Sequence, residues 1–124
     1  MSKKTKVEIS YGSYFGNNYN VVIQNGGLTY LFGHGPGPMM DHKMEVQLSN
    51  EEIGKFLTTL TRITRDWSKE YTNPEGITDG IGWSVRIFSQ ALSYNFEGYA
   101  EFPPNWRSFV KAVRALVGIK QFCG

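Results

Sequence analysis

The residues best suited to chemistry lie in one stretch rich in glycine and proline, residues 33–43. It contains both histidines, His34 and His42, with Asp41 beside the second. Two imidazoles and a carboxylate could ligate a divalent metal ion, and Asp41 with His42 could move a proton. Their spacing matches no known ligand pattern, however, and adjacent side chains diverge on an extended backbone. A solvated loop is therefore the simpler interpretation, and no metal or cofactor is predicted; because long loops are often functional, the three residues stay candidates for binding.

A second candidate group is aromatic. Tyr14, Phe15 and Tyr19 lie among glycine and asparagine in residues 12–19. Rings in a polar loop supply contact area at a low cost in conformational entropy, and they can also stack on a nucleobase. The alternative is that they fold inward as a small satellite cluster. They are candidate residues for contact with a partner or a ligand.

A third group is basic. Arg107, Lys111 and Arg114 are spaced by four and three residues, which places them along one side of a helix. Such a stripe can bind phosphates, although the solvated back of an amphipathic helix explains it more simply. The net charge of +2 is too small to indicate a nucleic-acid or membrane partner.

No nucleophile with a supporting base can be assembled from the sequence. Cys123 is the single cysteine, and the serines lack the strand-turn-helix setting of a nucleophile elbow. An enzyme that uses His34 or His42 is therefore the least favoured class. The absence of an internal disulfide and of any long apolar run favours a cytoplasmic protein without a membrane span.

Two segments predict amphipathic helices that could position these groups. Residues 49–68 and 104–118 each carry apolar side chains at spacings of three and four. Ser49 and Glu52 match a capping box at the start of the first helix. We expect Pro104 at the first position of the second helix and Gly118 at its C-terminal cap.

Alternating apolar and polar residues predict six strands around the helices. Asn25-Gly26 between two apolar runs indicates a tight hairpin, because a type I′ turn needs positive φ at both central residues. The order ββββ-α-ββ-α predicts an α+β fold, in which an antiparallel sheet of about six strands carries both amphipathic helices on one face. We expect a single globular domain over residues 1–124, with residues 1–5 disordered. The strand segments are residues 6–11, 19–24, 28–32, 44–48, 83–88 and 92–96.

The same alternation predicts a polar second face of the sheet. Arg86 and Phe88 fall on it, and arginine and aromatic residues dominate the hot spots of protein interfaces. The sharper hypothesis is a surface for a partner protein or for a homodimer. An ordinary solvated face is the simpler interpretation.

Residues 79–118 carry a composite motif. It begins with Asp79-Gly80 and Trp83, continues through Gly98 and Pro103, and ends with Asn105-Trp106 before the last helix. This motif resembles an Asp-Gly-x-x-Trp, Gly-x-Asn-x-x-Pro-x-Asn-Phe pattern found in a family of small bacterial proteins with no known activity. Ala100 or Glu101 stands where that pattern has asparagine, and Trp106 replaces its phenylalanine. The resemblance implies that the second hairpin and the last helix lock together.

These observations favour a small cytoplasmic binding module of bacterial or phage origin. We expect it to bind another protein, as an inhibitor, an immunity factor or an anti-defence factor. The alternative is a binder of a small anionic ligand such as a nucleotide, with contacts from Tyr14, His34, Arg86 and the basic helix.

Overall fold

The computed structural model describes residues 5–12, 17–24, 26–34, 42–72, 81–89 and 92–118. Within these residues the chain forms seven strands and two helices, one strand more than the sequence predicts. The elements are β1 (Thr5–Gly12), β2 (Asn17–Gln24), β3 (Gly27–His34), β4 (His42–Gln47), α1 (Asn50–Thr64), β5 (Glu70–Thr72), β6 (Gly82–Ser89), β7 (Leu92–Tyr99) and α2 (Trp106–Val117).

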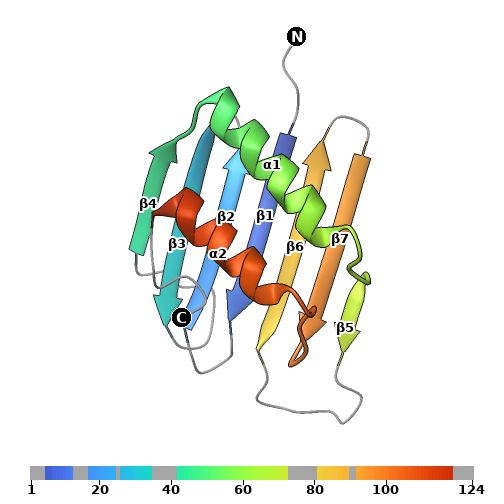
Figure 1. Cartoon of the computed structure of the whole chain (residues 1–124). Coiled ribbons are helices and arrows are strands. Elements are labelled where there is room, and N and C mark those ends of the chain that lie inside the picture. Colours follow the sequence, from blue (N-terminus) through green and yellow to red (C-terminus); the bar gives the residue numbers. More distant parts are fainter. Residues whose placement is uncertain are drawn as a thin grey trace.

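All seven strands belong to one sheet, in the order β4-β3-β2-β1-β6-β7-β5. Every neighbouring pair is antiparallel except β5 with β7, which is parallel. Both helices cross the same face of this sheet, side by side (Figure 1). The α+β class and the one-sided helix layer are confirmed, whereas the prediction of a six-stranded, purely antiparallel sheet is wrong.

The additional strand is β5, in a segment that the sequence predicts to be loop from Tyr71 onward. Its three residues are too short for alternation to show, and the strand follows directly after the turn that ends α1. The backbone N–H of Glu97 donates to the carbonyl of Lys69 at 3.0 Å, which brings this segment against β7. The connection along α1 carries the chain from β4 at one edge of the sheet to β5 at the other edge, where β5 pairs in parallel with β7.

The first elements agree closely with the sequence. β1 begins at Thr5, one residue before the predicted strand segment. β2 and β3 form the predicted hairpin, and Gly26 in its turn has the positive φ of 76° that the type I′ turn demands. Asn25 lies outside the described residues.

Helix α1 begins with the predicted capping box. The backbone N–H of Glu52 donates to Oγ of Ser49, and the N–H of Ser49 donates to the Glu52 carboxylate, both at 3.0 Å. The helix ends at Thr64, four residues before the end of the predicted segment 49–68. Trp67 continues the apolar spacing of the helix, but it lies in the turn that follows α1, where it is buried.

Helix α2 begins at Trp106, with Asn105 as the N-cap residue. Pro104 therefore precedes the helix, and the prediction that it occupies the first helical position is wrong. The N–H of Trp106 donates to the carbonyl of Pro103 at 3.1 Å, so the two prolines belong to a turn that leads into the helix. Gly118 caps the other end in the left-handed conformation, as predicted, and its N–H donates to the carbonyl of Arg114 at 2.8 Å.

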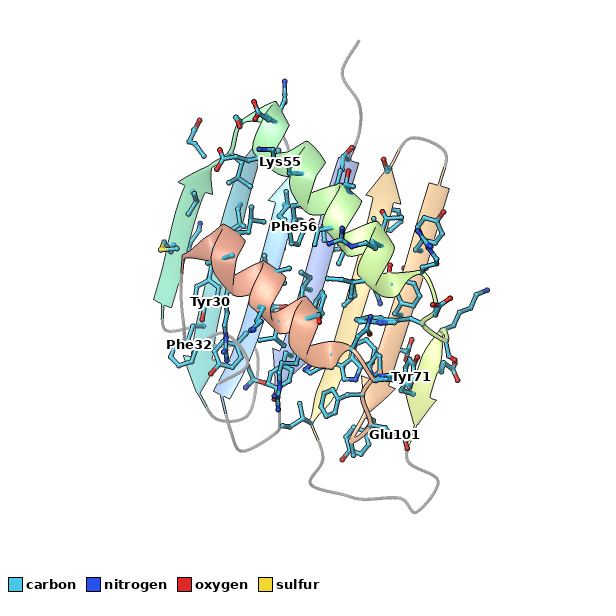
Figure 2. All side chains as sticks on the ribbon, in the orientation of Figure 1. Tyr30, Phe32, Lys55, Phe56, Tyr71 and Glu101 are labelled. Carbon is cyan, nitrogen blue, oxygen red and sulfur yellow. The ribbon has the colours of Figure 1, made fainter. Side chains whose placement is uncertain are left out.

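The core fills the layer between the helices and the sheet. Phe56 points from α1 toward the strands and is buried, whereas Lys55 points away and is exposed (Figure 2). Most strand residues that face the helices are buried, including Val7 and Ile9 on β1 and Val85 and Ile87 on β6. Alternation along the strands therefore assigned the two faces correctly.

An aromatic cluster closes one end of this core, and it includes Trp83 and Trp106 of the composite motif, whose residues Asp79-Gly80 lie outside the described residues. The rings of Trp67, Trp83 and Trp106 contact one another, with centroids 4.8–5.9 Å apart. Nε1 of Trp83 donates to the carbonyl of Glu101 at 2.8 Å, and the ring of Tyr71 contacts the Trp83 ring. The second hairpin and the last helix are locked together through these contacts.

Candidate functional site

The side of the sheet away from the helices is the most extensive candidate surface, and we call it the open face. Strand register aligns one side chain from each of six strands across it, and all of them are exposed or half-buried. Their alternating neighbours on the helix side are mostly buried, so the contrast between the two faces is clear. In sheet order the row is Glu45, Thr29, Val22, Glu8, Arg86 and Asn95.

Arg86 and Phe88 lie two residues apart on β6, near the middle of the sheet. Both are exposed, as the sequence predicts for this face, and Phe88 has 37% of its surface accessible. Register places Lys6 and Ser93 on either side of Phe88. Burial of the exposed part of Phe88 against a partner would lower the free energy, because apolar surface would be removed from water.

The charge of Arg86 is uncompensated within the described residues. Glu8 lies opposite it on β1, but the Glu8 carboxylate is 3.8 Å from Nζ of Lys6 instead. No ion pair or hydrogen bond of the Arg86 side chain occurs in the described part of the chain. The guanidinium group, a planar donor of up to five hydrogen bonds, therefore presents its charge to whatever contacts this face.

Polar side chains next to Arg86 give the open face hydrogen-bonding capacity. Oγ of Ser10 donates to Oδ1 of Asn20 at 2.6 Å, across the pairing of β1 with β2. Ser84 lies on the other side of Ser10, on β6. Apolar surface from Val22 and Phe88 is thus interleaved with polar groups, a composition that matches the surfaces of non-obligate protein interfaces.

Two carboxylates at the β7–β5 edge were missed by the sequence analysis. Glu70 and Glu97 are directly paired by register, and both are exposed. Only the parallel strand β5 brings them together, and its three residues carry no periodic signal. They add negative charge at one margin of the open face.

Of the three aromatic candidates in residues 12–19, the structure describes only the side chain of Tyr19. Tyr19 is 2% exposed and packs on Tyr11, Tyr30 and Phe32 within the core, so it is not a surface ring. Its place follows from β2, where Tyr19 aligns with Val21 and Ile23 on the helix side. Tyr14 and Phe15 lie outside the described residues.

Strands β3 and β4 extend further into residues 33–43 than the sequence predicts. His34 ends β3 and His42 begins β4, so both belong to strands by their backbone, opposite Asn17 and Phe32. Asp41 and the histidine side chains lie outside what the structure describes. Among the side chains that are described, no cluster of three or more metal-ligating residues occurs.

The basic candidates lie on the other side of the molecule. Arg107 and Lys111 are exposed and Arg114 is half-buried on α2, in the helix layer. The sheet and its core separate them from Arg86. The structure therefore does not bring Arg86 and the basic helix together around one small ligand, as the anionic-ligand hypothesis requires.

We compared the chain with protein-family models and with curated proteins. No protein-family model matches the chain, and no curated protein matches its sequence. Of the two helices described, neither is long and apolar enough to cross a membrane.

Proposed function

We propose that this chain is a protein-binding module that contacts its partner through the open face, with Arg86 and Phe88 as anchors. The observation that supports this proposal most strongly is the pair itself. An exposed phenylalanine lies beside an arginine that has no ion pair among the described residues, on an inner strand and on the side of the sheet that carries neither helix. Anchors of these two types, near the centre of a surface, are typical of interface hot spots.

The form of the module fits an inhibitor or immunity-type factor better than a catalyst. Arg86 is the charged centre of the face, and the described side chains around it provide neither a metal-ligand cluster nor a nucleophile paired with a base. A binder needs only a rigid, complementary surface, and a seven-stranded sheet backed by a packed helix layer supplies one. We place this activity in the cytoplasm of a bacterium or of a phage-infected cell.

A double variant tests the proposal. Arg86→Ala with Phe88→Ala should abolish specific capture of a partner from the native host, because both anchors are lost. For the partner purified after capture, the affinity should fall about 30-fold or more, which corresponds to a loss of at least about 2 kcal/mol. Binding would be measured by titration calorimetry.

The matched control removes the same kinds of side chain from the opposite side. Arg65 is exposed after α1, and Tyr94 is 45% exposed on the helix side of β7. Arg65→Ala with Tyr94→Ala should leave the affinity unchanged. Equal binding by the Arg86/Phe88 variant and the natural protein would contradict the proposal.

A further inference from the structure

The two edges of the sheet differ in their capacity to pair with another strand. At one edge, β5 has three residues, and so short a strand offers few backbone groups to a second chain. At the other, β4 has six residues, and in the described part of the chain it pairs only with β3. The outer N–H and C=O groups of β4 are therefore a template for an additional strand.

The side chains of β4 are arranged in a self-complementary way. Lys43, Glu45 and Gln47 are exposed on the open face, whereas Met44 and Val46 are half-buried on the helix side. Nζ of Lys43 lies 3.0 Å from a carboxylate oxygen of Glu45, so opposite charges stand side by side along the edge. A second copy of the same edge, running in the opposite direction, presents these charges in reverse order.

We propose that β4 pairs antiparallel with β4 of a second copy, about a twofold axis that passes through Met44. In this register Lys43 of each copy lies opposite Glu45 of the other, and the two Met44 side chains meet on the helix side. The four charges alternate in sign around a square. Residues 42–46 of both copies form the ladder, and the two sheets join into one with both helix layers on the same side.

Charge complementarity selects this register over its neighbours. An axis through Glu45 would place the two glutamates directly opposite each other, and an axis through Lys43 would do the same for the lysines. Like charges directly opposite on paired strands are destabilising. Only the axis through Met44 matches both charged positions of each copy and also buries the exposed part of the Met44 side chain.

The resulting dimer is concentration-dependent, because one short ladder buries little surface by the standard of obligate dimers. It leaves the open face uncovered and doubles its area. The inference is therefore independent of the proposed function: loss of Arg86 and Phe88 should not change the oligomeric state, and loss of the β4 contact should not remove the anchors.

Sedimentation equilibrium over a wide concentration range tests the proposal by charge exchange. The natural chain should reach the mass of a dimer. Lys43→Glu alone and Glu45→Lys alone should each weaken dimerisation about tenfold or more, because each places like charges opposite each other twice. An equal mixture of the two variants should dimerise again, since every position across the new ladder then carries opposite charges.

Both substituted side chains are exposed, so circular dichroism should show folded variants with melting temperatures close to that of the natural protein. Three outcomes would overturn the proposal: a natural chain that stays monomeric at every concentration, single variants that dimerise as well as the natural chain, or a mixture that fails to restore the dimer. A dimer that is abolished by Arg86→Ala with Phe88→Ala would instead place the contact on the open face, and this too would overturn it.

Discussion

Gly98 lies opposite Trp83 on the neighbouring strand, and the indole occupies the space in which a Cβ would stand. Atoms Cε2 and Cζ2 of Trp83 are 2.5 and 2.7 Å from that position. The ring cannot yield easily, because its Nε1 is held by the carbonyl of Glu101 and its faces contact other rings. We therefore predict that Gly98→Ala destabilises the fold by roughly 1–3 kcal/mol, measured by urea unfolding.

The control for this prediction is the same substitution in helix α1. Gly54 is exposed, and a Cβ built on it meets nothing within 4 Å. Gly54→Ala should stabilise the protein by up to about 1 kcal/mol, because alanine favours the helix more than glycine does. If the two substitutions changed the free energy of unfolding equally, packing against Trp83 would not explain the need for glycine at position 98.

Ala100 has a φ of 57°, the left-handed conformation that alanine adopts only at a cost. The backbone is held there by the N–H of Ala100, which donates to the carbonyl of Ile81 at 2.9 Å. Ala100→Gly should relieve this strain and stabilise the fold by about 1 kcal/mol in thermal or urea unfolding. A loss of stability would mean that the Ala100 methyl group contributes more by packing than it costs in strain.

The sequence predicted whether some individual side chains are exposed or buried. The exposure of Arg86 and Phe88 followed from alternation. For Tyr19 the sequence left surface contact and inward packing both open, and the structure has inward packing because β2 begins two residues earlier than predicted.

At the scale of the elements, Asn105 joins the end of α1 to the start of α2. Its Oδ1 accepts from Nε1 of Trp67 at 2.6 Å, and its Nδ2 donates to the carbonyl of Ile63 at 2.8 Å. Asn105 occupies the N-cap position of α2, yet its side chain makes no capping hydrogen bond there. Its amide braces the two helices instead.

We predict that Asn105→Ala costs roughly 1–3 kcal/mol, because an indole N–H and a backbone carbonyl lose their partners in a part-buried site. Urea unfolding would measure the change. Asn95→Ala, on the exposed side of β7, should change stability by no more than about 0.5 kcal/mol. A cost for Asn105→Ala as small as that of Asn95→Ala would contradict the role of a brace.

Helices and long strands were predictable because their signals repeat over several turns or residue pairs. The capping box, the Asn-Gly hairpin and the C-terminal Gly118 each leave a local signature. The end of α1 was placed too late, because Trp67 continues the apolar spacing although it lies in a turn. β5 escaped detection, since a three-residue strand is defined by the neighbour it pairs with and not by its own pattern.

At the scale of the whole molecule, one side of the sheet is packed and the other is open. This division was predictable, because a one-residue alternation assigns every strand side chain to a face. The separation of Arg86 from the basic stripe of α2 follows from the same division, because the helices were predicted on the face opposite Arg86. The order of the strands, in contrast, depends on long-range pairing that no local segment encodes.

Site-specific photocrosslinking in the native host tests most directly whether the partner contacts the open face or the helix side of the sheet. A photoreactive phenylalanine analogue would replace Phe88 in one variant and Tyr94 in another; both positions are exposed and aromatic, on opposite sides of the sheet. We predict that the probe at position 88 yields one discrete cross-linked partner and that the probe at position 94 yields none. A partner captured from position 94 and not from position 88 would contradict the claim that the open face is the surface of recognition.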